Sequence, residues 1–545
     1  MSDQLRAELA RIAAMLEAAD VSFVVERPRD QGHGDWATNL AMGIAKARKS
    51  NPHKIAEEIV ALLALPAGVV AKTAIAGPGF INFWLAEDQL AEQLRDIIRQ
   101  GPAYGRSAAG AGKRVNVEFV SANPTGPLHV GHGRGAALGD VIATLLQWTG
   151  HQVTREFYIN DAGSQIDKLG WSLWARVQQA VGREGTIPEG GYHGEYLVES
   201  AALLLAERGP AFADLPDATA VPVCRAFALR TQRIEQDDLM RDFRVVFEVH
   251  TSEQSLYDNG KVEAALTLLR ERGLLFDLDG ALWLRTTSFG DDKDRVLKKS
   301  DGTYTYLVPD IAYHVDKFAR GFEYLIDVWG ADHHGYIPRM RAVLVALGHP
   351  GESFEVPLVQ LVKVVRGGEE MKMSKRAGNF VTLRDLVDEV GVDAARYFFL
   401  MRRGVTPFTF DVDLAKKQTD ENPVFYVQMA HARMAGIFRV AGRPMDEVGD
   451  AADMAGLPAP QDAELLKALT AFPDAVARAA AERQPQRITS FLEDLARVSH
   501  GWYHHCRVLG EPPAVEQSRL VLARAARIVL RNGLGLLGLT APDRM

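Results

Sequence analysis

Residues 114–134 read RVNVEFVSANPTGPLHVGHGR, and their pattern predicts the architecture of the central part of the chain. It predicts a short β-branched strand over Arg114 to Val120, a loop rich in proline and glycine, and a helix over Gly133 to Trp148. A strand, a loop and a helix in this order form the repeating unit of a doubly wound parallel sheet, which binds its ligands at the carboxyl ends of the strands. We therefore expect an α/β domain of the Rossmann type, with a ligand site where the loop meets the helix.

The motif His129-Val130-Gly131-His132 stands where this loop enters the helix. The first N–H groups of a helix lack partners inside it and, together with the helix dipole, favour phosphate. Gly131 would let a flat base approach the backbone, because glycine has no side chain in the way. A half-formed metal site or two surface histidines would give the same pattern, and the motif alone does not decide between these alternatives and a nucleotide site.

A second motif, Lys372-Met373-Ser374-Lys375-Arg376, follows the turn-like stretch 366–370 and precedes Thr382-Leu383-Arg384-Asp385, which predicts a capped helix start. Most basic loops of this kind are solvated surface. A departing pyrophosphate, however, needs cations that move in as negative charge develops, and a basic loop provides them. The order and separation of the two motifs fit one nucleotide site built from both halves of a split domain.

The chain of 545 residues is too long for one hydrophobic core, and its pattern divides it into three blocks. Residues 1–112 begin with a helical pattern and end in an alternating strand and a Gly- and Ala-rich linker, which predicts an α+β block. Residues 113–390 are α/β, with an insertion at about 168–299. Residues 391–545 predict an all-α block.

Composition narrows the class of protein. Hydrophobic residues make up 47% and charged residues 24% of the chain, and the only cysteines, Cys224 and Cys506, suggest neither a disulfide framework nor a zinc site. No signal peptide and no membrane-spanning run is evident, so we expect a soluble cytoplasmic protein. The net charge of −8 argues against indiscriminate nucleic-acid binding. Residues 391–545 differ, with 19 Lys and Arg, 16 of them Arg, against 18 Asp and Glu. That composition fits RNA binding and a solvated helical surface equally well.

With both motifs in order, the chain resembles the class I aminoacyl-tRNA synthetases. His129 to His132 is similar to their HIGH motif, and Lys372 to Arg376 is similar to KMSKS. The closer resemblance is to the bacterial arginyl-tRNA synthetases, and it extends over nearly the whole length. The blocks that carry it are 118–134, 304–314, 329–334, 391–397 and 422–428.

The resemblance implies an arginine–tRNA ligase that first joins arginine to AMP from ATP and then transfers the acyl group to the 2′-hydroxyl of the terminal adenosine of tRNA(Arg). The implied catalytic residues are His129, His132, Lys372 and Lys375. The implied ATP-binding residues are His129, Gly131, His132, Asp332, His334, Lys372, Met373, Ser374 and Lys375. The implied arginine-binding residues are Glu118, Asn123, Glu253, Tyr306 and Asp310.

The resemblance also implies the partners of each block. The N-terminal block would contact the elbow of the tRNA and the helical block its anticodon, in a monomeric enzyme with no membrane partner. Mg²⁺ would accompany ATP, held largely by phosphates and water, so we name no protein ligand for a metal. Members of the family typically need tRNA before they form the adenylate.

Arginine as the substrate explains the acidic residues chemically. A guanidinium is planar, permanently charged and bound best by carboxylates in bidentate geometry. For any one of these acids, an ordinary salt bridge remains the alternative. Position 331, where related enzymes can have a polar residue, is Ala331, which leaves the contacts of that loop open.

Two functions of other classes remain as alternatives. Another nucleotidyl transferase with the same two motifs would usually be a single catalytic domain, and the flanking blocks count against it. A tRNA-binding relative without catalysis would be expected to have lost His132 or Lys375, and both are present.

Overall fold

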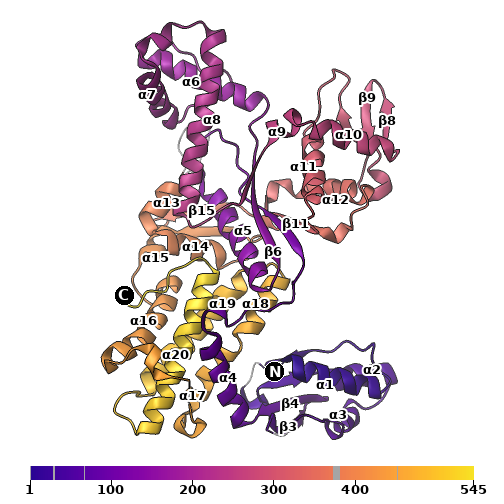
Figure 1. Cartoon of the computed structure of the whole chain (residues 1–545), viewed down its shortest axis with the longest axis vertical. Coiled ribbons are helices and arrows are strands. Elements are labelled where there is room, and N and C mark those ends of the chain that lie inside the picture. Colours follow the sequence, from indigo (N-terminus) through magenta and orange to yellow (C-terminus); the bar gives the residue numbers. More distant parts are fainter. Residues whose placement is uncertain (1, 29–30, 67, 372–380, 451) are drawn as a thin grey trace.

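The structure is a computed structural model that describes residues 2–28, 31–66, 68–371, 381–450 and 452–545 (Figure 1). A parallel sheet lies at the centre of the molecule. The helical C-terminal block and the N-terminal block lie below the sheet in the view of Figure 1, and two outlying modules lie above it. Within the described residues, no helix is both long and apolar enough to cross a membrane.

The N-terminal block is a four-stranded antiparallel sheet packed with three helices. The strand order is β1-β2-β4-β3. Leu5, Leu9 and Ile12 of the first helix are fully buried against Phe83, which confirms the helical pattern of the sequence. The elements are α1 (Ser2–Met15), β1 (Val25–Glu26), β2 (Trp36–Thr38), α2 (Leu40–Arg48), α3 (Pro52–Ala61), β3 (Val70–Ala76) and β4 (Phe80–Leu85).

The connection to the central sheet is packed against the C-terminal block. It contains α4 (Glu87–Gln100) and a short 3-10 turn, η2 (Gly101–Ala103). Asn532 Nδ2 donates hydrogen bonds to the carbonyl oxygens of Gly101 and Tyr104, at 2.9 and 3.1 Å. The start of the predicted linker is therefore held in place by the last long helix of the chain.

The central sheet is parallel and has the order β13-β11-β5-β6-β7. The chain runs from β5 to β6 and β7 on one side and later to β11 and β13 on the other, so the strand order reverses beside β5. Such a reversal is where doubly wound sheets bind ligands, and the predicted fold is confirmed. The strands are β5 (Arg114–Glu118), β6 (Gln152–Ile159), β7 (Val249–Ser252), β11 (Tyr324–Asp327) and β13 (Phe354–Glu355), and α5 (Val130–Trp148) connects β5 to β6.

The range 168–299 forms two modules separated by β7, a strand of the central sheet. The first is helical and has its own hydrophobic core around Leu173, Leu197 and Leu204. It consists of α6 (Ser164–Ala180), α7 (Tyr196–Arg208), η3 (Pro210–Asp214) and α8 (Asp217–Asp242). The second consists of α9 (Glu253–Asp258), α10 (Lys261–Glu271), β8 (Leu275–Leu278), β9 (Ala281–Leu284), η4 (Thr287–Phe289) and β10 (Arg295–Lys298).

In the second half of the α/β block, β15 pairs in parallel with β17, a strand that comes after residue 390. Thr382 caps α13 in a capping box with Asp385, as the sequence predicts. The elements are α11 (Leu307–Ala319), β12 (Trp329–Gly330), η5 (Ala331–Tyr336), α12 (Ile337–Ala346), η6 (Gly351–Ser353), β14 (Leu358–Val359), β15 (Val362–Arg366), β16 (Glu369–Glu370), α13 (Leu383–Val390), α14 (Val392–Leu400), β17 (Phe408–Asp411) and α15 (Val412–Lys416).

A buried charge cluster joins the C-terminal helices to α5. Arg396 of α14 is 0% exposed and places Nη2 2.6 Å from Asp140 Oδ2 in α5. Its Nε donates to the carbonyl oxygen of Leu537 at 3.0 Å, and Arg155 Nε donates to Asp140 Oδ1 at 3.0 Å. The helices are α16 (Pro423–Ala441), α17 (Pro460–Thr470), α18 (Phe472–Ala481), α19 (Gln486–His505) and α20 (Pro513–Leu536), with the short turns η7 (Met445–Val448) and η8 (Met454–Gly456).

Candidate active site

The two histidines of the first motif cap the N-terminus of α5. His129 is the N-cap residue, and its Nδ1 accepts hydrogen bonds from the N–H groups of Gly131 and His132 at 3.1 and 3.4 Å. His132 Nδ1 accepts the N–H of His129 at 3.2 Å, and the two rings stack with centroids 3.7 Å apart. The helix therefore begins at Val130, before the predicted start at Gly133, and both motif histidines stand at the predicted ligand edge of the sheet.

The second motif, with Lys372, Met373, Ser374 and Lys375, lies outside the described residues. The segment that follows it is described and lies beside the first motif. Thr382 forms a β-bridge with His129, and the N–H of Leu383 donates to the carbonyl oxygen of Leu128 at 2.8 Å. The fold therefore brings the residues just after the second motif to the first, as a split nucleotide site requires.

Two acidic side chains, one at the start of the second module and one on α11, interact electrostatically. Glu253 begins α9 directly after β7 and is 7% exposed, and Asp310 lies in the first turn of α11. Burial, together with the negative charge of Asp310, raises the pKa of Glu253 to about 7, although the hydrogen bond of the Tyr158 hydroxyl lowers it. Burial also raises the pKa of Asp310, although the Tyr336 hydroxyl donates to Asp310 Oδ2 at 2.5 Å.

These two carboxylates are suited to bind a cationic ligand. Among the described residues, no basic side chain lies within 4 Å of the Glu253 or Asp310 carboxylate, whereas most other buried acids of the chain are ion-paired. Burying a carboxylate without a partner is costly. A ligand with a guanidinium or ammonium group would supply that partner.

The other predicted arginine-binding residues differ in exposure. Tyr306 is 74% exposed at the N-cap of α11, one turn before Asp310, and therefore lies at the outside of the acidic pair. Asn123 is half-buried, and its side-chain amide donates to Gln165 Oε1 at 2.9 Å. The predicted adenosine neighbours Asp332 and His334 are exposed on η5, which follows directly after β12.

Glu118 is bound by protein partners on both carboxylate oxygens. Oε2 lies 2.5 Å from Lys317 Nζ, and Oε1 accepts the hydroxyl of Ser121 at 2.8 Å. The same Ser121 oxygen accepts the N–H of Tyr158 at 3.2 Å. Val120 and Ser121 have positive φ angles of 68° and 39°. These are strained conformations for residues with a Cβ, and the bonds to Glu118 and Tyr158 hold them where the loop begins.

Sequence reasoning missed several residues that build this pocket. Lys317 and Tyr336 contact the predicted acids but lie outside the sequence blocks, and His314, which ends the block 304–314 and contacts the carbonyl oxygen of Asp310, has no predicted role. For two of them a signal exists in the sequence, because His314 and Lys317 follow Asp310 at the spacing of one helix face.

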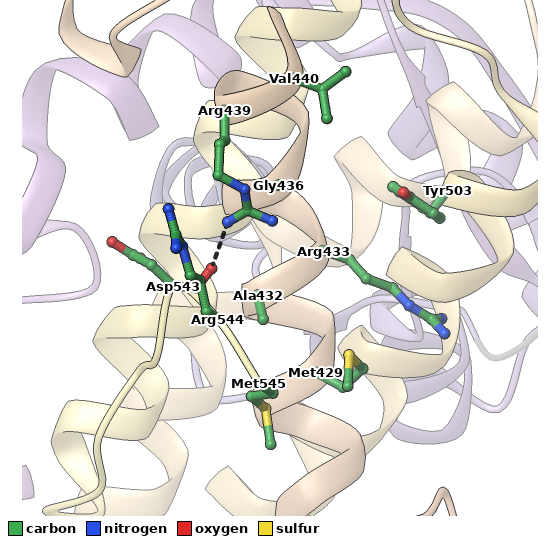
Figure 2. A pocket seen from close by; sticks show the side chains of 10 residues that line it. All are labelled: Met429, Ala432, Arg433, Gly436, Arg439, Val440, Tyr503, Asp543, Arg544 and Met545. Carbon is green, nitrogen blue, oxygen red and sulfur yellow. Dashed lines mark hydrogen bonds between the residues drawn. The ribbon is translucent and has the colours of Figure 1, made fainter. Parts of the chain in front are cut away.

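The C-terminal block has an open groove between α16, α19 and the last residues of the chain (Figure 2). The groove holds about 560 Å³. Figure 2 shows Arg433 on the side of Tyr503, whereas Arg439 lies on the opposite side, where its Nη1 donates to the carbonyl oxygen of Asp543 at 3.3 Å. Cations beside an aromatic ring and the apolar side chains Met429 and Met545 offer a base both stacking and phosphate contacts.

Among the described residues, no group of three or more His, Cys, Asp or Glu side chains is placed to hold a metal ion. Cys224 and Cys506 are both buried free thiols, and burial raises their pKa, to about 12 for Cys224 and about 11 for Cys506.

Three family models match the chain over most of its length. The arginyl tRNA synthetase N-terminal domain matches residues 1–85, and the catalytic domain of class I (R) tRNA synthetases matches 93–190 and 216–401. The DALR anticodon binding domain matches 427–545. All three parts of the chain therefore point to the same family.

Known proteins give the same result. The arginine–tRNA ligase of Geobacillus kaustophilus is 48% identical over 100% of this chain and 98% of its own length. The arginine–tRNA ligase of Bacillus subtilis is 46% identical, with the same coverage. The solved structure of Thermus thermophilus arginyl-tRNA synthetase superposes with a TM-score of 0.80 at 24% identity, over 100% of both chains, and supports the fold. With the first motif at the edge of a doubly wound sheet and family matches along the whole chain, this protein belongs to the arginyl-tRNA synthetases, the class I enzymes that are arginine–tRNA ligases.

Proposed function

We propose that this enzyme activates L-arginine with ATP and transfers it to the 2′-hydroxyl of the terminal adenosine of tRNA(Arg), with the three blocks 1–112, 113–390 and 391–545 sharing the work. The observation that carries the choice of amino acid is the pair of carboxylates formed by the buried Glu253 and the half-buried Asp310, without a cation among the described residues. Two acids match the two sides of a guanidinium fork, and lysine would satisfy the pair less well because its ammonium is a point charge.

The other end of arginine would lie toward the loop after β5. Asn123 would contact the α-amino or carboxylate group directly, and Glu118 would act there through Ser121, whose hydroxyl it holds. Tyr306 would cover the guanidinium side from the outside. Arginine bound in this way would present its carboxylate to the N-terminus of α5, where ATP would bind.

The ATP site would combine both motifs. His129, Gly131 and His132 would hold the adenosine and phosphates at the start of α5, with Asp332 and His334 beside the ribose or adenine. Lys372, Met373, Ser374 and Lys375 would approach the β- and γ-phosphates, because Thr382, which follows them in the sequence, lies next to His129. Mg²⁺ would enter with ATP, bound mainly by phosphate oxygens and water.

The first step would need no side-chain nucleophile. The carboxylate oxygen of arginine attacks the α-phosphorus, the bond to the bridging oxygen of the β-phosphate breaks, and pyrophosphate leaves with both electrons of that bond. The 2′-hydroxyl of the tRNA then attacks the acyl carbon, and AMP leaves. Positioning and electrostatic stabilisation would supply the rate enhancement.

The tRNA would be held by the N-terminal and the C-terminal blocks, which both lie below the sheet in Figure 1. The N-terminal block would contact its elbow, and the groove around Arg433 and Tyr503 would take an anticodon base (Figure 2). We further propose that the enzyme acts as a cytoplasmic monomer.

The helical block is connected to the proposed ATP site through buried contacts. Arg396 binds Asp140 of α5 and the carbonyl oxygen of Leu537, and α5 is the helix that begins at this site.

Pyrophosphate exchange tests the assignment. Each amino acid is offered with ATP, with and without tRNA(Arg), and the exchange of labelled pyrophosphate into ATP is measured. Exchange with arginine alone among the amino acids supports the proposal, and exchange with a different amino acid overturns it.

A further inference from the structure

Three buried carboxylates form a row across the middle of the central sheet. Asp327, Glu118 and Glu156 are paired in register on the neighbouring strands β11, β5 and β6, and their exposed fractions are 0%, 7% and 0%. Residues paired in register on parallel strands point to the same face of the sheet. These three acids would repel one another unless cations lay between them.

Lys317 of α11 is the cation for two of the three. Its side chain is fully buried, with Nζ 2.5 Å from Glu118 Oε2 and 2.9 Å from Asp327 Oδ1. Burial opposes its charge, but the carboxylates of Asp327 and Glu118 outweigh this and raise the pKa of Lys317 above its ordinary value. The third acid, Glu156, is bound by Arg320 Nη2 at 2.8 and 3.0 Å.

His314 fastens the same helix to the same strand edge. Its Nε2 lies 2.8 Å from Asp327 Oδ2, and its Nδ1 lies 2.7 Å from the carbonyl oxygen of Asp310. Asp310, His314 and Lys317 therefore share one face of α11. Asp310 lies about two helical turns, roughly 10 Å, from the Lys317 anchor.

We propose that Lys317 is a positioning residue for the amino-acid pocket: by binding Glu118 and Asp327 it sets where α11 lies on the sheet, and thereby the separation of Asp310 from Glu253. This inference rests on the proposed function, because it assigns Lys317 to the arginine pocket. The guanidinium donors form a rigid fork, so both carboxylates must stand in fixed places. Glu118 also holds Ser121 at the opposite end of the pocket, so the same ammonium fixes both ends.

The test is Lys317→Met in the full-length enzyme, with KM for arginine, KM for ATP and kcat measured in the charging of tRNA(Arg). We expect KM for arginine to rise about tenfold or more while KM for ATP changes less than about threefold, because only the arginine pocket depends on the position of α11. A loss confined to kcat, or equal changes in KM for both substrates, would overturn the proposal.

Lys261→Met is the matched control. Lys261 Nζ lies 2.7 Å from Asp316 Oδ1, so this variant also removes a lysine ion pair from α11, but one that does not reach the sheet. We expect KM for arginine to stay within about twofold of the parent, as for other partly exposed ion pairs. A rise equal to that of Lys317→Met would mean that any loss of charge on α11 has this effect, and would overturn the assignment of Lys317.

A further variant separates positioning from charge balance. Lys317→Met with Asp327→Asn leaves fewer unpaired carboxylates but still lacks the anchor, so the raised KM for arginine should persist. Restoration of the parent KM would show that Lys317 serves only to neutralise charge and would overturn the proposal.

His314→Gln weakens the second contact that holds α11 on the sheet and should also raise KM for arginine. If Lys317→Met, the double variant with Asp327→Asn, and His314→Gln all fail to fold, Lys317 is a residue of fold stability and the proposal is wrong. If the parent enzyme itself does not use arginine, the proposed function fails instead.

Discussion

The most informative perturbation of the arginine pocket is Glu253→Gln, which keeps the size of the side chain and removes its charge. In the parent, arginine binds the ionised carboxylate, whose pKa without ligand is about 7 because the side chain is buried next to Asp310. The dissociation constant for arginine should therefore fall about tenfold per pH unit from pH 5 to pH 7 and level off above pH 7. Burial also raises the pKa of Asp310. Protonation of Asp310 would therefore make the dissociation constant for arginine depend more steeply on pH under acidic conditions.

The size of the effect follows from burial. At pH 8, loss of one charged partner of a desolvated guanidinium costs about 2–5 kcal/mol, so the variant should bind arginine about 30-fold more weakly or worse. Its affinity should also lose the part of the pH dependence that Glu253 causes. Isothermal titration calorimetry of arginine from pH 5 to pH 8 measures both. Asp258→Asn, an exposed acid on the same helix, is the control and should bind as the parent does. Equal affinity of the Glu253 variant and the parent at pH 8 would refute the reasoning.

The same pKa predicts an effect on stability. A carboxyl group with a pKa of about 7 when folded, against an ordinary 4.5, favours the folded state below pH 4.5 and loses that contribution as the pH rises through 7. The difference corresponds to about 3 kcal/mol for a group that is this well buried. Glu253→Gln should therefore raise the thermal midpoint at pH 8 and leave it nearly unchanged at pH 4. A thermal midpoint at pH 8 that is lower in the variant than in the parent would contradict the inference that Glu253 carries an unpaired buried charge.

The remaining predictions concern the two motifs and the buried junction. His129→Ala removes the helix cap and should cost about 1 kcal/mol of stability, whereas His129→Asn keeps a capping acceptor and should cost less. Both variants should slow pyrophosphate exchange. Parent-level exchange in either variant would contradict a role of His129 in ATP binding. Lys375→Ala should slow arginine activation by about 10²-fold, measured by single-turnover kinetics, and leave arginine binding nearly unchanged, measured by calorimetry. Near-normal activation would show that the second motif has no role in catalysis. Arg396→Met leaves Asp140 paired with Arg155 but removes the donor to the carbonyl oxygen of Leu537, so it should cost about 1–3 kcal/mol of stability. An unchanged thermal midpoint would contradict the importance of this buried junction.

Features with a strong local signal were predicted from the sequence. The helix starting at Leu383 was expected because Thr382 and Asp385 form a capping box, and both hydrogen bonds are present. The strand and helix of residues 114–148 were expected from their periodicity and connectivity, and they form β5 and α5. The first motif was placed correctly at the edge of the sheet because ligand sites of doubly wound folds follow from topology.

Features that depend on tertiary contacts were missed. β7 is four residues long and polar in part, so neither its length nor its alternation distinguishes it from a loop, and only its neighbour β6 makes it a strand. The start of α5 was placed too late because histidine is not a preferred N-cap residue; here two histidines cap each other's backbone. The spacing of Lys317 from Asp310 puts both on one helix face, but nothing in the local sequence indicates that Glu118 and Asp327 bind this lysine.

Arginine-dependent charging of tRNA(Arg) tests the central claim most directly. Purified full-length enzyme, ATP and Mg²⁺ are combined with each amino acid, and pyrophosphate exchange and aminoacyl-tRNA are measured with and without tRNA(Arg). We predict that arginine alone supports exchange, that exchange begins only when tRNA(Arg) is added, and that the product is arginyl-tRNA. Exchange with arginine in the absence of tRNA would contradict only the coupling between the tRNA and the active site. Charging of a different amino acid, or no product with arginine and tRNA(Arg) together, would contradict the account.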